Sequence, residues 1–270
     1  MTVAELLATA NLPTREARSL LAFVLGARRE WLIAHPDAAV DETRHARFAA
    51  LIERRLRGEP VAYLLGAQEF YGRDFRVNPA VLIPRPETEL LVDTVLAAIR
   101  AVDAPRVLDL GTGSGCVAIT LALERPDAVV TGTDRSAGAL AVARDNAKRL
   151  GARVAFVESD WYARIEGRFD AIVANPPYIA SGDPHLPALR DEPLHALTDH
   201  TDGLAHLRAI VAGASPHLRP GGVLMVEHGY DQGAAVRALF DAAGFQSIET
   251  RRDAAGLDRI CSGRVGGRTG

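Results

Sequence analysis

Short apolar runs alternate with longer amphipathic stretches through most of this chain, from residue 106 onward. Apolar runs bounded by turn residues are typical of buried strands, and the amphipathic stretches are typical of helices. This alternation predicts an α/β fold with a parallel sheet covered by helices on both faces. The predicted strands are 107–110, 129–133, 154–157, 171–174, 223–226, 246–249 and 257–261. The predicted helices between them are 116–124, 137–150, 204–218 and 232–243.

The first part of the chain has a different pattern, in which apolar residues recur at helical spacing. Thr2 and Glu5 have the spacing of a capping box, and the pattern over 41–57 ends at Gly58. We therefore expect residues 1–66 to form a small helical domain. Two interpretations stay open, a substrate-docking module and a stabilising cap.

Residues 67–86 separate the two patterns and are predicted to be a β-hairpin and an extended linker. Residues 68–77 alternate in polarity around Gly72, which is typical of a hairpin. Two prolines flank Arg85 and favour an extended segment, after which Glu87 or Thr88 is predicted to cap a helix over 90–99. We expect the third region, 87–270, to be a Rossmann-like domain with a seven-stranded, mostly parallel sheet. Its last residues, 263–270, are expected to be frayed.

Composition excludes several classes of protein. With 270 residues, 48% of them hydrophobic, the chain can bury a large core. A net charge of -3 argues against tight, phosphate-dominated nucleic-acid binding, although it leaves a local basic patch open. Cys116 and Cys261 lie far apart, so we expect two buried thiols and no disulfide or zinc site. We find no apolar run of the ~20 residues that a membrane span needs and no leader pattern, and we expect a cytoplasmic protein without membrane contact.

The stretch 169–178 is the first candidate for chemistry. An apolar strand ends at Asn175, and two prolines follow that hold the chain rigid as it leaves the sheet. The amide oxygen of Asn175 and the carbonyl of Pro176 are two hydrogen-bond acceptors, and Tyr178 supplies a flat aromatic face. Such a set suits a planar NH₂ group. Taken alone, the stretch is better explained as a strand followed by a proline-rich turn, and only the motif upstream reverses that preference.

A glycine-rich motif follows the first predicted strand of the sheet and opens the next helix. Glycines there let the backbone approach a ligand, and a helix N-terminus favours a negative group. A dinucleotide fingerprint would have a sixth-position glycine where this chain has Cys116. A ligand with one nucleoside and a carboxylate fits better. The candidate cofactor-binding residues of this motif are Gly111, Thr112, Gly113, Ser114 and Gly115.

Two further strand ends carry residues suited to a nucleoside. Asp134 follows the second strand, where an acidic residue accepts hydrogen bonds from ribose hydroxyls. Asp160 and Trp161 follow the third strand and offer an acceptor and an aromatic face for adenine. Individually Asp134 could be a helix cap and Trp161 a core residue. In this order, and followed by Asn175, they favour S-adenosylmethionine over a dinucleotide.

These motifs resemble those of class I S-adenosylmethionine-dependent methyltransferases that modify planar amide or exocyclic amino nitrogens. The helical N-terminal segment, the runs 59–66 and 82–89 and the run 226–229 narrow the resemblance to the release factor glutamine methyltransferase (PrmC/HemK) family. It covers nearly the whole chain. Two regions depart from the family pattern, a shortened and altered stretch at 186–202 and a Gly/Arg-rich tail after Cys261.

The resemblance implies methylation of the side-chain amide nitrogen, N5, of the glutamine in the Gly-Gly-Gln loop of bacterial class 1 release factors. Asn175, Pro176 and Tyr178 would be the catalytic residues, and together with Pro177 they would bind the substrate. S-adenosylmethionine would be the cofactor, bound by Asn175 as well as by the residues given above, with S-adenosylhomocysteine as the product. We expect no metal, no stable nucleic-acid partner and a monomer.

Three alternatives remain. An N6-adenine or N4-cytosine methyltransferase could present the same two acceptors to a flipped base, but it should carry a basic recognition domain. An oxidoreductase on a Rossmann sheet is disfavoured by Cys116. A non-catalytic module that holds a partner through the helical domain is disfavoured by the intact motif from Asn175 to Tyr178.

Overall fold

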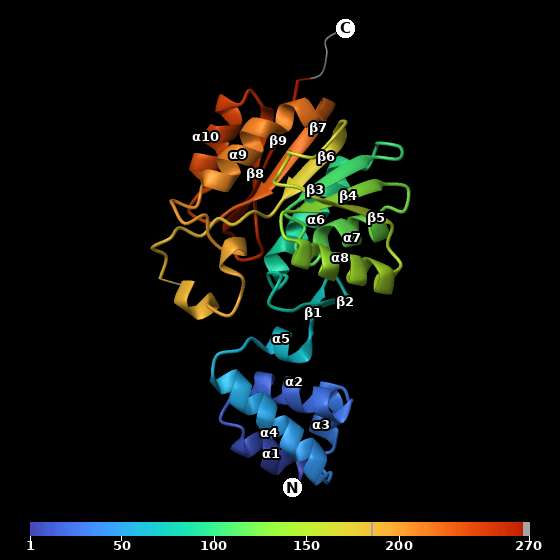
Figure 1. Cartoon of the computed structure of the whole chain (residues 1–270), viewed down its shortest axis with the longest axis vertical. Helices are drawn as coiled ribbons and strands as arrows, with labels where there is room; N and C mark the ends of the chain where they lie inside the picture. Colours follow the sequence, from blue (N-terminus) through green and yellow to red (C-terminus); the bar gives the residue numbers. More distant parts are fainter. Residues whose placement is uncertain (185, 267–270) are drawn as a thin grey trace. The chain divides into compact units, whose positions relative to one another are not determined.

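The computed structural model describes residues 1–184 and 186–266. The chain forms two compact units, Met1–Ala67 and Gln68–Gly270 (Figure 1). Each unit has its own hydrophobic core.

The first unit consists of helices packed around a small apolar core that includes Leu20, Leu21 and Phe48. The capping box is confirmed, because Thr2 Oγ1 accepts a hydrogen bond from Glu5 N and Glu5 Oε2 accepts one from Thr2 N, at 3.3 and 2.8 Å. The helices are α1 (Val3–Thr9), α2 (Thr14–Leu25), α3 (Arg29–Ala34), α4 (Glu42–Leu56) and α5 (Val61–Leu65).

The predicted hairpin around Gly72 is confirmed. Strands β1 (Ala67–Phe70) and β2 (Arg73–Arg76) form a two-stranded sheet. Tyr71 and Gly72 have φ values of 53° and 72°, the left-handed conformation that a tight two-residue hairpin turn requires. Phe70 and Phe75 are buried in the core of the second unit, with ring centroids 6.0 Å apart. The hairpin is therefore packed into that unit.

The predicted seven-stranded, mostly parallel sheet is confirmed. Its strand order is β5-β4-β3-β6-β7-β9-β8, in which β9 runs antiparallel to both of its neighbours. After β3 the chain adds β4 and β5 on one side of that strand, and it then returns to add β6 on the other side. The topological switch point therefore lies between β3 and β6. The strands are β3 (Arg106–Leu110), β4 (Val129–Asp134), β5 (Val154–Glu158), β6 (Phe169–Ala174), β7 (Leu218–Glu227), β8 (Gln246–Arg252) and β9 (Asp258–Arg264).

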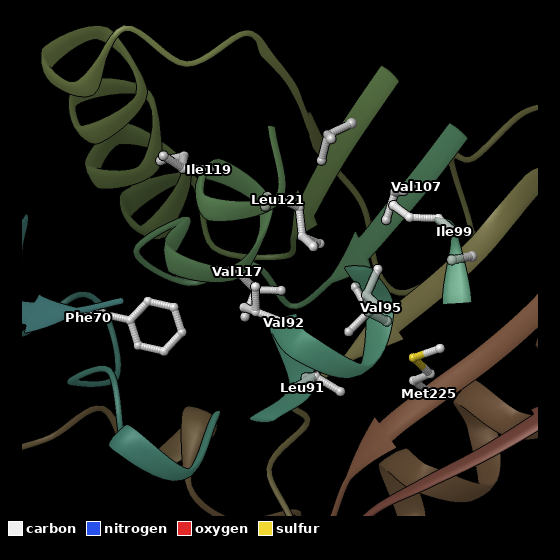
Figure 2. Packing of buried hydrophobic residues seen from close by; sticks show 14 of the residues in the cluster. Phe70, Leu91, Val92, Val95, Ile99, Val107, Val117, Ile119, Leu121 and Met225 are labelled. Carbon is white, nitrogen blue, oxygen red and sulfur yellow. The ribbon is translucent and has the colours of Figure 1, made fainter. Parts of the chain in front are cut away.

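Helices cover both faces of the sheet (Figure 1). One face packs against α6 (Glu89–Ala98), α7 (Cys116–Glu124) and α8 (Ala137–Leu150), and the other against α9 (Ala205–Ala214) and α10 (Gly233–Ala242). Alternate residues of one strand enter different cores, as in β3, where Val107 faces the α6 side and Leu108 the other. Figure 2 shows the core on the α6 side of the sheet. In this core, Val92 and Val95 of α6 lie near Val117, Val107 and Met225.

Four details differ from the predictions. The helix expected over 204–218 ends at Ala214, because Ser215–His217 form a 3₁₀ turn and Leu218 already belongs to β7. Neither Glu87 nor Thr88 caps α6 with its side chain, since Pro86–Thr88 form a 3₁₀ turn that leads directly into the helix. Cys261 is buried as expected, but Cys116 is partly exposed.

The fourth difference concerns the tail that was expected to be frayed. Strand β9 continues to Arg264, and Gly263 pairs with Leu224 of β7. The last part of that expectation, 267–270, lies outside the described residues. Within the described ranges, none of the helices combines the length and the apolarity that a membrane crossing requires.

Asn146 provides a test of how the hairpin is held. It is fully buried in α8, accepts a hydrogen bond from Arg76 N at 2.8 Å, and donates to Arg76 O and Ser114 O at 3.0 and 2.9 Å. Asn146→Ala would leave these backbone groups without partners, and we expect it to lower the free energy of unfolding by about 3 kcal/mol in urea titrations.

Asp145→Ala is the matched control, because it removes only the exposed ion pair with Arg76 from the neighbouring position of the same helix. We expect it to cost about 0.5 kcal/mol. Equal stability losses in the two variants would contradict this account of Asn146.

Candidate active site

The strand register brings the candidate residues to one edge of the sheet. Leu110 of β3 pairs with Thr133 of β4 on one side and with Ala174 of β6 on the other. The residues that follow these three are Gly111, Asp134 and Asn175, so they begin side by side at the carboxyl ends of the strands. In open α/β sheets this edge, at the switch point, is where ligands bind.

A pocket opens at this edge. Nine of the predicted site residues line it: Gly111, Thr112, Gly113, Ser114, Asp134, Asp160, Trp161, Asn175 and Pro177. Among the residues that the structure describes, Gly115, Pro176 and Tyr178 lie outside that lining. Gly115 is the N-cap of α7, and Pro176 is buried.

The glycine-rich loop needs glycine for different reasons at different positions. Gly111, Gly113 and Gly115 all have positive φ, at 72°, 53° and 82°. A Cβ at Gly115 would also lie 2.7 Å from Ile119 Cδ1 and 3.2 Å from Ala143 Cβ, so this glycine lets α7 and α8 pack closely. A Cβ at Gly113 would meet nothing within 4 Å, so its neighbourhood is open.

Asp109 holds the loop from beneath. It is buried at the end of β3, and its Oδ2 accepts hydrogen bonds from Thr112 Oγ1 at 2.6 Å and from Ala118 N at 3.2 Å. Burial raises the pKa of this carboxyl to about 7. Asp109 lines the pocket as well, and the sequence analysis did not include it among the site residues.

Two groups in the loop have hydrogen-bonding capacity that a ligand could use. Ser114 is buried, and its hydroxyl has no hydrogen-bond partner among the described residues. Asp134 accepts hydrogen bonds from Gly113 N at 3.0 Å and Ser136 N at 2.9 Å, which occupies one site on each carboxylate oxygen. A carboxylate offers about four acceptor sites, so Asp134 can still accept from a diol.

Trp161 is placed by an unusual backbone conformation. Its φ is 44°, and its carbonyl accepts a hydrogen bond from Ser159 Oγ at 2.9 Å. Its ring lies 5.3 Å from that of His206, between centroids, on α9. His206 also lines the pocket, and burial lowers the pKa of its imidazole. A histidine near the start of a mostly apolar helix carried no local signal of a site.

Asn175 is oriented by a residue from a distant part of the sequence. Its Nδ2 donates to Thr88 Oγ1 at 3.0 Å, which leaves its Oδ1 as the acceptor available to a ligand. Tyr178 is held by its hydroxyl, which donates to Glu227 Oε1 at 3.2 Å. The sequence indicated Thr88 only as a possible helix cap. Its contact with Asn175 depends on the fold, because the two residues lie far apart in the sequence.

The segment 186–202 contributes a wall of the pocket through His195 and Ala196. Glu192 holds it there, because its carboxylate accepts hydrogen bonds from Arg85 Nη2 at 2.5 Å and Ile83 N at 3.1 Å. Arg85 lines the pocket too. The two prolines around Arg85 marked this position as rigid, but no sequence feature showed what it faces.

Comparison with known proteins agrees with this geometry. Residues 86–191 match the family described as Methyltransferase small domain, and residues 2–66 match the PrmC N-terminal domain. A solved structure, the T. thermophilus 16S rRNA N2 G1207 methyltransferase in complex with AdoMet and guanosine, shares the fold with a TM-score of 0.54 and 21% identity over 73% of this chain and 49% of that one. The fold and the family match define the second unit as a methyltransferase domain.

Closer relatives narrow the class. The release factor glutamine methyltransferase of Burkholderia pseudomallei is 53% identical over 98% of this chain and 97% of that protein. The protein of the same name from Bordetella pertussis is 53% identical over 96% of this chain and 97% of its own length. This chain therefore belongs to the release factor glutamine methyltransferase family.

Two glycines of the loop form a matched pair for a stability test. Gly113→Ala adds only the strain of a left-handed alanine, which we expect to cost about 1 kcal/mol in the free energy of unfolding. Gly115→Ala adds the same strain and overlap with Ile119 and Ala143, so we expect about 2–4 kcal/mol. Thermal and urea unfolding measure both, and equal losses would show that the packing of α7 on α8 does not depend on Gly115.

Proposed function

We propose that this protein transfers a methyl group from S-adenosylmethionine to the side-chain amide nitrogen, N5, of the glutamine in the Gly-Gly-Gln loop of bacterial class 1 release factors. The observation that carries the proposal is the position of Asn175 and Gly111 at paired strand ends of a chain in this family. The two residues put an acceptor for an NH₂ group beside a loop suited to the methyl donor.

The residues of the pocket suit S-adenosylmethionine. Gly111 and Gly113 allow close approach of the backbone, and Thr112, Ser114 and Gly115 complete the loop at the start of α7, whose N-terminus favours a carboxylate. Asp134 would accept hydrogen bonds from the ribose hydroxyls, and Asp160 and Trp161 would hold the adenine. When bound, S-adenosylmethionine supplies an activated methyl group on a cationic sulfur, a good leaving group.

The protein's own residues must compensate for a weak nucleophile. The lone pair of an amide nitrogen is delocalised, so nitrogen gains positive charge as it attacks. Asn175 Oδ1 and the carbonyl of Pro176 would each accept one N–H of the glutamine amide, hold the nitrogen in line with the methyl group and stabilise that charge. The ring of Tyr178 would pack on the amide plane beside Pro177. Asn175 would also border the bound cofactor.

The first unit would supply the area that a protein substrate needs. A pocket that holds one glutamine side chain is smaller than the roughly 800 Å² per partner of a stable protein interface. Residues 2–66 match the PrmC N-terminal domain, and we propose that they dock the release factor. The protein would act as a cytoplasmic monomer without a stable nucleic-acid partner.

Asp134→Ala tests the cofactor assignment. The variant loses the ribose contacts, and we expect affinity for S-adenosylmethionine to fall roughly 10- to 100-fold by calorimetry. Asp127→Ala is the matched control, since Asp127 is an exposed carboxylate paired with Arg125 outside the pocket. Equal affinities for the two folded variants would contradict the role of Asp134.

Asn175→Ala tests the chemistry. Because the proposed contact strengthens as charge develops on nitrogen, turnover should fall ~10²–10³-fold while affinity for the release factor changes little. Single-turnover transfer of a labelled methyl group to release factor, with DNA and RNA as parallel substrates, provides the measurement. A wild-type rate in the variant would remove Asn175 from the mechanism, and label in nucleic acid would favour the base methyltransferase alternative.

A further inference from the structure

The end of β7 brings one more group to the edge of the sheet where the site lies. Ala174 pairs with Val226, so Glu227 is the neighbour of Asn175 in the strand register. Its carboxylate is almost fully buried, with 1% of the residue exposed. A buried carboxylate is costly unless it has partners, and neither cofactor nor substrate binding as proposed above uses it.

Glu227 connects two pieces of the substrate site. Its Oε1 accepts a hydrogen bond from the hydroxyl of Tyr178 at 3.2 Å. The Thr88 hydroxyl is a second neighbour, close enough to the carboxylate to lower the pKa of Glu227 against the larger rise that burial causes. Oε2 is buried and has no hydrogen-bond partner in the described ranges, so it can accept the hydrogen of a nearby hydroxyl.

The direction of the hydrogen bonds decides the orientation of Asn175. Thr88 Oγ1 accepts from Asn175 Nδ2 at 3.0 Å, and its own hydrogen must then point to another acceptor. An ionised carboxylate can only accept, so Glu227 would fix the Thr88 hydroxyl as a donor to its unpartnered Oε2. The chain of bonds would then run from Asn175 through Thr88 to Glu227 and hold the Asn175 amide oxygen on the side of the pocket.

The opposite orientation of the amide would be inactive in the proposed reaction. It would turn the NH₂ group of Asn175 toward the NH₂ group of the substrate, two donors facing each other. In a site of low polarity an unpaired donor is expensive, so the preference for one orientation is strong. A neutral amide in place of Glu227 could both donate and accept, and would no longer impose it.

We propose that Glu227 is a positioning residue, which acts through Thr88 to fix the acceptor face of Asn175 and through the Tyr178 hydroxyl to fix the ring that packs on the substrate amide. This inference rests on the proposed function. It assigns to the pair of Thr88 and Glu227 a role in turnover rather than in cofactor binding.

Ionisation of Glu227 sets the conditions for the test. Burial raises the pKa of its carboxyl to about 7, against the lowering effects of Thr88, Tyr178 and Arg259, and Glu87 adds to the rise. Burial raises the pKa of the Cys116 thiol at the start of α7 to about 12, and the charges of Asp109 and Glu227 add to that rise. At pH 8 the carboxylate is mostly ionised, so assays belong there.

The experiment measures kcat and KM for methylation of release factor, together with the Kd for S-adenosylmethionine, in Glu227→Gln and Thr88→Val. We expect kcat to fall roughly 10- to 100-fold in both, as for misplaced reacting groups, with KM and Kd close to the wild-type values. Thr88→Ser keeps the hydroxyl and should recover most of the rate that Thr88→Val loses. The double variant should be no slower than the slower single variant, because both changes break the same chain of bonds.

Thr94→Val is the matched control for a buried hydroxyl, in the helix that follows Thr88. Thr94 is buried in α6, its hydroxyl donates to Leu90 O at 2.7 Å, and it is not part of the pocket lining, so kcat should stay at the wild-type value. A wild-type kcat in folded Glu227→Gln, a loss seen only in KM or Kd, or additive losses in the double variant would overturn the inference. A wild-type protein that transfers no methyl group to release factor would overturn the proposed function instead, which separates the two failures.

Discussion

The geometry of the site depends on the register of four parallel strands at the centre of the sheet. The pairing of β4, β3, β6 and β7 brings their carboxyl ends side by side, and the residues that follow the last pairs are the candidate site residues. Register in a buried sheet is set by side-chain packing, because a slip by one residue would exchange the two faces. Here both faces are apolar and meet different helices, so Val107 and Leu108 each have a fixed core. Packing far from the pocket thus determines where Gly111 and Asn175 stand.

Buried polar side chains hold the loops in fixed positions relative to the sheet. Asp109 binds the first turn of α7 and Thr112, and Asn146 joins the same loop to the hairpin. Neither residue has a surface role, and both satisfy backbone or hydroxyl groups that would otherwise be buried without partners. The loop that would receive the cofactor is therefore held in place by α7, α8 and the hairpin in addition to its own glycines.

Local patterns in the sequence predicted the elements well, because each depends on nearby residues. Helices α7 and α8 begin and end where the periodicity predicted, and all seven strands were found. The error at 204–218 arose because apolar positions at helical spacing resume at Leu218, after Ser215–His217, where the chain changes from a helix to a strand.

Contacts between distant segments could not be predicted in the same way. Thr88 lies 87 positions from Asn175, and Arg85 lies 107 positions from Glu192. His195 and His206 reach the pocket from a segment with little regular structure and from the start of α9. No spacing in the sequence brings these pairs together, so the motifs identified single residues of the site, whereas the partners that orient them required the fold.

The chemistry of an amide explains why such partners matter. No side chain of ordinary basicity can deprotonate an amide nitrogen, so the proposed site can help only by geometry and by stabilising charge as it forms. A carboxylate in direct contact with the sulfonium would stabilise the cation of the ground state as well, and uniform stabilisation does not accelerate the chemical step. Glu227 follows Val226 at the end of β7, and in the proposed arrangement the Thr88 hydroxyl links its carboxylate to Asn175. In that position its charge can set the direction of the hydrogen bonds, while the groups that would meet the substrate are the neutral oxygens of Asn175 and Pro176.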